Sequence, residues 1–424
     1  MNFPLSILQG VSADVPWTYL VFALIGFGFG FSLEMSGFGN SKKLAAQFYF
    51  TDLTVLKVMF TAIVVGMVLI FTMVGAGILD YNLVWVNLTY LSSGLLGGII
   101  MGVGFIIGGF CPGTSVVSAS TGKIDGMIFL LGGFFGAFLF GETEQYFTNW
   151  YNNSGFYGRV TMMDFLGIPT GWVVLLIVLM ALFMFWGSEQ LERIFGKRDL
   201  AKEPRWRFGA AAALVLMAVV VIFLGSPSNT EKYTKVTLPR TIEEQQVKLS
   251  PEEVLAKGYA QITPAELFKT MNDDKLILTV IDVRSEAEYN LFHIKRAVNV
   301  PVSELPGHLK QLLGRTDPNV VNVLVSNDEA VATDAWKYLV AESVPNLYIL
   351  KGGINEWIAQ FGGTDPEIQK AETIGANGLQ YIFPAALGDR YECSDPSPIE
   401  YEKLEFAPVI QLQIKRDKSG GGCG

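Results

Sequence analysis

Long uncharged stretches alternate with short polar ones through the first half of the chain. An α-helix crosses the hydrocarbon core of a bilayer in about 20 residues, so most of these stretches are long enough to form a span. We therefore predict about six membrane-spanning helices in residues 1–225. The uncharged stretches are Val15–Leu33, Val58–Leu79, Tyr81–Gly122, Gly126–Gly141, Phe165–Ser188 and Phe208–Thr230.

The third stretch is too long for one span, and Cys111-Pro112-Gly113 is its natural break. Proline is well placed at the first position of a helix, because its missing N–H has no partner there. We predict a span over about 83–110 and then a short re-entrant half-helix that begins at Pro112. The start of such a half-helix carries free N–H groups and a positive dipole end. Cys111 lies directly before it, where a soft thiol suits a small anion with sulfur chemistry. The alternative is a buried cysteine that packs as a small hydrophobe.

From residue 226 the pattern becomes that of a soluble protein. The polar stretch 226–260 is typical of a linker. Beyond it, the short apolar runs Leu276–Val283, Val320–Val325 and Leu347–Leu350 are separated by helical patterns. Strands that alternate with helices predict a parallel α/β sheet.

Composition agrees with this division. Half of the residues are hydrophobic and 17% are charged, which is unusual for a soluble protein. The first 225 residues carry 12 acidic and 11 basic side chains, so almost all of the net charge of −9 falls on the rest of the chain. Neither half has the basic face that nucleic-acid binding needs. Three cysteines are too few for a Cys-rich metal site, and no nucleotide- or cofactor-binding motif appears, so we expect neither a metal nor a cofactor.

Lysine and arginine residues predict the orientation in the membrane. The loop between the last two predicted spans is the most basic one, so we place it in the cytoplasm. The final span would then lead residues 226–424 to the periplasmic side of a bacterial inner membrane. The basic residues of this loop are Arg193, Lys197, Arg198, Lys202, Arg205 and Arg207.

The membrane half contains a short internal sequence similarity. Gly37-Phe38-Gly39 recurs as Gly109-Phe110-Cys111, and Gly26 and Gly30 have counterparts at the same offset. Glycine spacing alone is also explained by close helix packing. The shared Gly-Phe before a helix break in both copies favours a true repeat, and transporters often place the substrate path where such repeats meet.

Two stretches carry a family resemblance: GFSLEMSGFGNSKKLAAQF over Gly30–Phe48 and GFCPGT over Gly109–Thr114. They resemble the YeeE/YedE family of sulfur-compound transporters, which includes thiosulfate uptake proteins, over about residues 20–140. In that family, cysteines at helix breaks line a central path and pass the anion along by weak thiol hydrogen bonds. The resemblance implies that Cys111 lies on the path, whereas Gly39 stands where a second cysteine would match. The surrounding path residues would be Gly37, Gly109, Pro112, Gly113 and Thr114.

Charged residues near the first break have two interpretations. Glu34 lies at the end of the first span, and ionisable groups at membrane depth are functional candidates. The alternative is an interface residue that pairs with Lys42 or Lys43. These two lysines would either attract an anion to the cytoplasmic mouth or serve as topology determinants.

Three stretches of the second half, Val280–Ile294, Ala297–Pro301 and Leu350–Trp357, resemble the rhodanese family over roughly residues 260–362. In active members, a strand ends in a catalytic cysteine, and the following loop wraps backbone N–H groups around a persulfide or anion. Here Ser326 stands at the cysteine position, and the loop contains Asp328 and Glu329. A serine hydroxyl cannot form a persulfide, and an acidic loop repels thiosulfate. We therefore predict no rhodanese catalysis, and we expect Asp282 and Arg284 to form a structural ion pair and His293 to be a core residue.

The chain ends in Gly-Gly-Gly-Cys423-Gly424. Glycine-rich segments behave as flexible coil, so Cys423 would be a thiol on a mobile arm. The tail is similar to the Gly-Gly-Cys-Gly-Gly terminus of the thiosulfate-carrier protein of the Sox sulfur-oxidation system, which implies a possible sulfur carrier. The alternatives are a disulfide with Cys393 in an oxidising periplasm and a disordered end.

The sequence thus predicts an α-helical polytopic membrane domain (1–225), a linker (226–260), a soluble α/β rhodanese-like domain (261–362) and an irregular extension (363–424). Its predicted function is inner-membrane transport of a small sulfur-containing anion such as thiosulfate, with a periplasmic domain that captures or presents substrate. Its partners would be this anion, membrane lipid and a sulfur-carrier or sulfur-oxidation protein. The alternatives are a membrane-anchored sulfurtransferase or carrier that uses Cys423, and a non-catalytic module that binds a partner.

Overall fold

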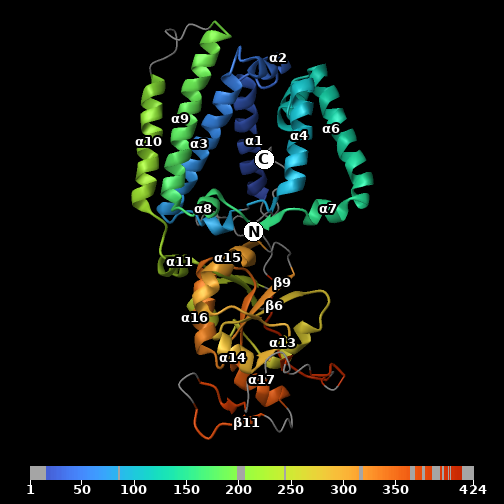
Figure 1. Ribbon diagram of the computed structural model, residues 1–424, viewed down its shortest axis with the longest axis vertical. Helices are drawn as coiled ribbons and strands as arrows, with labels where there is room; N and C mark the ends of the chain where they lie inside the picture. The colour runs from blue at the N-terminus through green and yellow to red at the C-terminus, as the bar shows by residue number, and fades with distance from the viewer. Residues whose placement is uncertain are drawn as a thin grey trace. The chain divides into compact units, whose positions relative to one another are not determined.

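Two compact units make up the computed structural model, one ending at Pro227 and the other running from Ser228 to Arg416. Figure 1 shows long helices in the first unit and a sheet flanked by helices in the second. The structure describes residues 16–84, 86–197, 206–242, 245–314, 319–362, 368–374, 378–383, 392–393, 396–399, 401 and 403–412.

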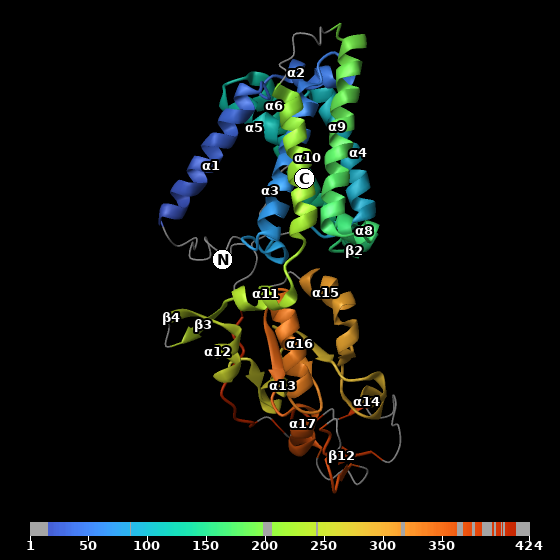
Figure 2. The ribbon, with the colours of Figure 1, turned by 90° about the vertical axis from the view of Figure 1, so that its left-hand side faces the viewer.

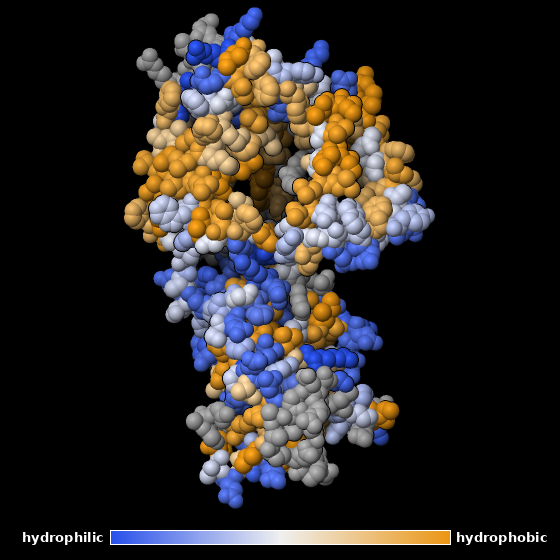
Figure 3. All heavy atoms as spheres, viewed as in Figure 1, coloured by the Kyte–Doolittle hydropathy of each residue, from blue (hydrophilic) through white to orange (hydrophobic). Residues whose placement is uncertain are grey.

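The first unit is built from apolar helices. Among the described residues, five helices are long and apolar enough to cross a membrane, and α1 (Pro16–Met35) is a further apolar helix. The apolar surface of this unit is plain in Figure 3. These findings confirm the predicted α-helical multi-pass membrane domain. The five are α3 (Thr54–Gly75), α4 (Leu91–Gly108, counted together with the short helix α5, Pro112–Ser120, that follows the break at Cys111), α6 (Ile124–Thr143), α9 (Thr170–Ile194) and α10 (Trp206–Leu224).

Helices α3, α9 and α10 pack against one another around small and β-branched side chains. Their approach is close where glycine permits it, since a Cβ on Gly171 of α9 would lie 2.7 Å from the Cα of Ile222 of α10. Small residues at helix contacts are the usual way to pack helices in a membrane. The buried residues of this cluster are Val64, Val68, Val174, Val178, Ala181, Ala218 and Val221.

The third span is shorter than its apolar stretch suggested. It begins at Leu91 rather than near residue 83, because the preceding residues fold across the end of the helices. Asp80 accepts a hydrogen bond from the backbone N–H of Asn82 (2.9 Å) at the start of a 3₁₀ turn, η3 (Tyr81–Leu83). Strand β1 (Thr89–Tyr90) then pairs antiparallel with β2 (Phe156–Gly158).

Short elements complete this unit. The polar and aromatic stretch between α6 and α9 forms three of them. The short helices are α2 (Ser41–Ala45), η2 (Ala46–Tyr49), α5 (Pro112–Ser120), η4 (Glu144–Tyr146), α7 (Thr148–Asn153) and α8 (Met162–Leu166).

A parallel sheet of five strands, in the order β5-β10-β9-β6-β8, organises the second unit. The central strand β9 (Val320–Val325) is buried at all six positions, as its largely apolar sequence predicted, and the one polar residue, Asn322, is buried with the rest. Apolar clusters that contain Trp336 and Trp357 fill the space between the sheet and its helices. This arrangement confirms the predicted α/β fold. The other strands are β5 (Gln261–Ile262), β6 (Ile277–Asp282), β8 (Val298–Asn299) and β10 (Leu347–Leu350).

Helices lie between these strands in the chain. They are α13 (Pro264–Met271), α14 (Glu286–Leu291), η6 (Val302–Glu304), α15 (Leu305–Gly314), α16 (Ala330–Ala341) and α17 (Gly353–Phe361). Short strands pair outside the main sheet: β7 (His293–Ile294) with β13 (Glu392–Cys393), and β11 (Gln369–Lys370) with β12 (Tyr381–Ile382).

The stretch 226–260 is not the linker that its polar composition suggested. It forms α11 (Asn229–Lys235), the hairpin strands β3 (Leu238–Ile242) and β4 (Gln245–Leu249), and α12 (Pro251–Ala256). Its few apolar residues are widely spaced, yet Leu249, Val254 and Ala260 are buried in the core of the second unit. Composition alone does not show that isolated apolar residues all reach one core.

The end of the described chain is tied back to this unit by a buried carboxylate. Glu266 of α13 accepts hydrogen bonds from the backbone N–H groups of Val409 and Ile410, both at 2.8 Å. Burial raises the pKa of Glu266, and these two bonds oppose the rise. The Tyr348 hydroxyl accepts a further bond from the N–H of Gln411 (2.8 Å). Residues 409–411 are therefore part of the fold rather than a loose tail.

Candidate functional site

Cys111 is the N-cap of the short helix α5, which begins at Pro112 as predicted. Its Sγ accepts hydrogen bonds from the backbone N–H of Thr114 (3.4 Å) and from the Thr114 hydroxyl (3.3 Å). The Thr114 hydroxyl in turn accepts a bond from the N–H of Cys111 (2.9 Å), which completes a capping box. The half-buried sulfur is thus held at the positive end of α5.

The break before α5 packs against the corresponding break after α1. Phe38 and Phe110, which follow the equivalent glycines of the proposed repeat, are both 1% exposed and share one apolar cluster. Gly109 has a φ of +72°, and a Cβ there would lie 3.1 Å from the Cβ of Ser41 and 3.2 Å from its carbonyl oxygen. Both the backbone conformation and the lack of space therefore require glycine at position 109.

Glu34 lies beside the same break, and its partner differs from the one expected. It pairs with Lys123 at 3.5 Å, not with Lys42 or Lys43. A Cβ on Gly39 would lie 2.6 Å from Oε2 of Glu34 and 2.8 Å from Nζ of Lys123. The charged ends of this exposed pair therefore lie directly beside Gly39, and a larger residue at position 39 would displace them.

Two lysines complete the polar surroundings of the first break. Nζ of Lys43 donates to the carbonyl of Ser36 (2.8 Å) and lies 3.0 Å from the position of a Cβ on Gly37, whose φ is +79°. Lys42 is exposed on α2, where its backbone N–H bonds to the Asn40 side chain (3.1 Å). Both views of the ribbon place α2 and α5 at the same end of the long helices (Figures 1 and 2). That end combines a thiol, a helix start and ammonium groups, which together favour an anion.

Hydrogen bonds in the loop after β9 of the second unit engage the Ser326 hydroxyl and both acidic side chains of the loop. The Ser326 hydroxyl donates to the carbonyl of Asp328 (2.5 Å) and accepts from the N–H of Ala332 (3.1 Å). Side chains of the loop accept two more N–H groups: Asp328 from Ala330 (2.8 Å) and Glu329 from Gly352 (2.9 Å). The carboxylates of Asp328 and Glu329 therefore lie among the N–H donors around this loop, and the absence of rhodanese catalysis stays a prediction from Ser326.

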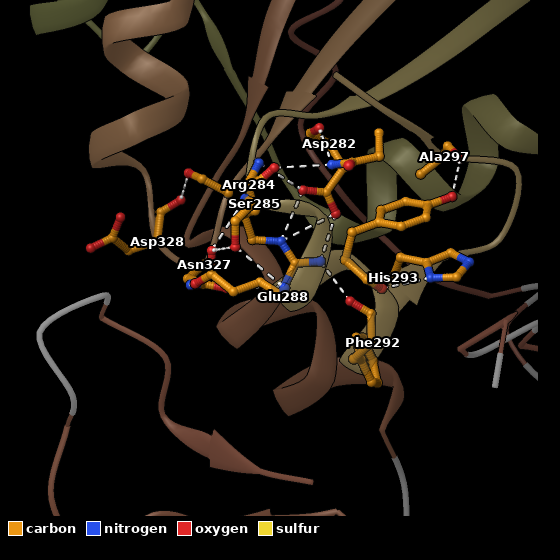
Figure 4. Close-up of polar contacts among 12 residues, drawn as sticks. Asp282, Arg284, Ser285, Glu288, Phe292, His293, Ala297, Asn327 and Asp328 are labelled. Carbon is orange, nitrogen blue, oxygen red and sulfur yellow. Dashed lines mark hydrogen bonds and ion pairs between the residues drawn. The ribbon is translucent and has the colours of Figure 1, made fainter. Parts of the chain in front are cut away.

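Beside this loop lies the predicted ion pair, which the structure confirms (Figure 4). Nε and Nη2 of Arg284 donate to the two carboxylate oxygens of Asp282 at 2.9 and 2.6 Å. Arg284 also donates to Asn327 Oδ1 (3.0 Å) and to the carbonyl of Phe292 (2.5 Å). Asp282 is fully buried, so the pair holds β6, the Ser326 loop and the end of α14 together.

His293 is a core residue, as expected. Its Nδ1 lies 2.9 Å from the carbonyl of Tyr289, and its ring stacks on the Tyr289 ring with the centroids 3.9 Å apart. Both contacts are within one turn of chain (Figure 4). These contacts fix the His293 ring at the end of α14, and neither contact joins the ring to a nucleophile that it could activate as a general base.

Comparison with known families decides what the two units are. The model of the sulphur transport family matches residues 35–242, and that of the rhodanese-like domain matches residues 263–360. The membrane half belongs to the sulphur transport family. The predicted fusion of a YeeE/YedE-type membrane domain with a rhodanese-like domain is confirmed, and together the two matches support a multi-pass membrane transporter of a sulfur compound.

More distant similarities cover little of the chain. A transcriptional regulator of the helix-turn-helix type, Rv0324 of Mycobacterium tuberculosis, is 35% identical over 71 residues, which are 17% of this chain and 30% of that protein. The crystal structure of the BH2092 protein from Bacillus halodurans aligns with 26% of this chain and 78% of its own, at 21% identity and a TM-score of 0.22. The sulphur transport assignment therefore depends on the family match alone.

Some site residues lie outside what the structure describes, and others were missed from the sequence. Cys423 is outside the described residues, and Cys393 is described only as part of the backbone of β13. Lys123 was missed, because the sequence places it 89 residues from Glu34. A lone lysine just before a predicted span was the available signal. Among the described residues, no group of three or more His, Cys, Asp and Glu side chains could hold a metal ion.

Proposed function

We propose that this sulphur-transport protein carries a small sulfur-containing anion, thiosulfate or a close relative, across the bacterial inner membrane past Cys111. The observation that carries the proposal is the position of Sγ of Cys111, held at the start of α5 by the N–H and the hydroxyl of Thr114. A soft, polarisable sulfur at the positive end of a helix suits a sulfur anion better than a hard, strongly hydrated one.

The thiol would act without forming a covalent bond. A cysteine S–H is a weak hydrogen-bond donor, so it can hold an anionic oxygen or sulfur briefly and release it. Conduction needs binding that is favourable enough for entry and weak enough for release. The close packing of the two breaks at Gly109 and Phe38 gives this position a fixed wall. Figure 3 shows the face of the membrane unit hollowed between α3 and α4, which is in keeping with a passage through it.

The rhodanese-like domain would bind a partner or present substrate on the periplasmic side rather than transfer sulfur. Support comes from Ser326 and Asp328, which use the loop's hydrogen-bonding groups internally. The periplasmic placement is supported by the basic residues around the connection from α9 to α10, among them Arg193 in the last turn of α9 and Arg207 at the start of α10. A sulfur-carrier or sulfur-oxidation protein is the partner that this placement suits.

Uptake of radiolabelled thiosulfate tests the proposed substrate. Cells that lack other thiosulfate routes should accumulate label when they express the full chain, and unlabelled thiosulfate should compete better than sulfate, because sulfate has no soft sulfur for Cys111 to bind. Cells with an empty vector are the control. Uptake that does not exceed the vector, or that sulfate inhibits as well as thiosulfate does, would contradict the proposed specificity.

A further inference from the structure

Arg159 is a buried cation at the other end of the membrane unit from Cys111. It directly follows β2 and precedes Thr161, the N-cap of α8, and its residue is 9% exposed. Figure 2 places β2 and α8 at one end of the long helices and α2 and α5 at the other. Helix α4 connects the two ends: its first residue, Leu91, follows the strand that pairs with β2, and its last, Gly108, precedes the Cys111 break. Its 18 residues span about 27 Å.

The guanidinium of Arg159 has an incomplete set of contacts. Its Cζ lies 5.5 Å from the centre of the Tyr81 ring, which covers one face. Both Nε and Nη2 are buried and have no hydrogen-bond partner among the described residues. Burying a cation without a partner for its N–H groups is expensive, and a buried polar group of this kind in a native protein usually meets a water, an ion or a ligand.

Two carboxylates lie close to this region along the chain, Asp80 next to Tyr81 and Asp164 in α8, and both accept hydrogen bonds from other groups. Asp164 accepts hydrogen bonds from the N–H and the hydroxyl of Thr161 at 3.1 and 2.8 Å, within the capping box of α8. Asp80 accepts from the N–H of Asn82. Burial raises the pKa of the Tyr81 hydroxyl, Arg159 opposes the rise and Asp164 adds to it, so the guanidinium and a carboxylate both act on this ring. Neither carboxylate hydrogen-bonds to Nε or Nη2 of Arg159.

The same chain shows what these two atoms bind when they are satisfied. In Arg284, Nε and Nη2 form the edge that holds both oxygens of the Asp282 carboxylate. This edge presents two parallel N–H groups, which match any pair of oxygens about as far apart as those of a carboxylate, sulfate or phosphate. In Arg159 that edge is buried and unoccupied by protein groups.

We propose that Arg159 binds the transported oxyanion through its Nε–Nη2 edge, as a second site at the far end of the membrane unit from Cys111. The inference depends on the proposed function and names the ligand class: a small anion with at least two terminal oxygens, such as thiosulfate. The anion would meet the arginine at one end of the unit and the thiol at the other. Because the arginine binds oxygen atoms and the thiol favours sulfur, the Arg159 site would accept both thiosulfate and sulfate, whereas the Cys111 site would prefer thiosulfate.

Isothermal titration of the purified full chain in detergent, with sodium thiosulfate and with sodium sulfate, tests this site. Arg159→Lys keeps the positive charge but loses the two-pronged edge, so both anions should bind about tenfold more weakly or worse. Cys111→Ala should bind sulfate as the wild type does. Melting temperatures measured without anion show whether Arg159→Lys is folded. On adding sulfate, the wild type and Cys111→Ala should gain a marked increase in melting temperature, and Arg159→Lys should not.

Two results would overturn the inference. Equal sulfate affinity in the wild type and Arg159→Lys would mean that the guanidinium edge binds a water only. Loss of all anion binding in Cys111→Ala would place the single site at the thiol. Neither result depends on uptake, so a failure of this second site is distinguishable from a failure of the proposed transport, which the uptake of thiosulfate tests separately.

Discussion

Replacing Arg284 with methionine is expected to destabilise the rhodanese-like domain by about 3–5 kcal/mol, because it leaves the fully buried Asp282 carboxylate without its partner. The loss extends beyond the ion pair, since Arg284 also donates to Asn327 and to the carbonyl of Phe292. These bonds connect β6, the Ser326 loop and the end of α14, so the substitution should loosen all three. Many domains have a total stability of only about 5–15 kcal/mol. The rhodanese-like domain of the Arg284→Met variant should therefore be largely unfolded in mild denaturant.

Hydrogen exchange in β9 of the full chain measures this effect, because all six residues of the strand are buried and exchange there reports unfolding of the domain. The matched control is Lys337→Met, which removes a cation from the exposed 3.9 Å pair with Glu252. Exposed pairs contribute about 0–1 kcal/mol, so β9 in this control should exchange nearly as in the wild type. Similar exchange in the two variants would refute the structural role of Arg284.

Replacing Glu192 with alanine is expected to destabilise the membrane unit by about 3 kcal/mol. Glu192 is fully buried on α9 and accepts hydrogen bonds from the N–H of Leu53 and from Nζ of Lys57, both at 2.6 Å. Leu53 is the N-cap residue of α3, so one carboxylate joins α9 to the start of α3. Its removal leaves a buried N–H and a largely buried ammonium group without this acceptor.

Glu189, one turn earlier on α9, provides the matched control. Its ion pair with Arg207 is as short as that of Glu192 with Lys57, at 2.5 Å, but both of its side chains are more than a fifth exposed. Glu189→Ala should therefore lower stability by less than about 1 kcal/mol. Thermal unfolding of the two purified variants in detergent makes the comparison. If Glu189→Ala lowered the melting temperature as much as Glu192→Ala, burial would not be what makes Glu192 important.

Sequence reasoning predicted the features that depend on local pattern. The start of α5 at Pro112 follows from the conformational preference of proline, and the bounds of β9 follow from its run of valine and leucine, which only Asn322 interrupts. The ion pair of Asp282 and Arg284 was also predictable, because its partners are two residues apart at the end of a strand.

Features that depend on long-range contacts were not predictable in this way. The partner of Glu34 is Lys123, from the other copy of the proposed repeat, whereas the sequence offered the nearer Lys42 and Lys43. The carboxylate of Glu192 on α9 accepts a hydrogen bond from Leu53 at the start of α3. The spacing of these two residues along the chain does not indicate this contact. The prediction of a linker at 226–260 was wrong for the same reason: the sequence does not show that the isolated apolar residues Leu249 and Val254 pack into a core built by later parts of the chain.

Thiosulfate uptake by Cys111→Ala is the measurement that tests the central claim most directly. The variant removes the sulfur that α5 holds at its start, together with the hydrogen bonds that this sulfur accepts from Thr114, while Pro112 at the first helical position and the bond from the N–H of residue 111 to the Thr114 hydroxyl are kept. Ser120→Ala, at the exposed end of the same helix, is the control, since its hydroxyl donates only to the carbonyl of Val117 among the described residues. The account predicts that Cys111→Ala falls to the uptake of cells without the protein while Ser120→Ala transports as the wild type does. Equal uptake by Cys111→Ala and the wild type, at equal amounts of protein in the membrane, would remove Cys111 from the path of the anion.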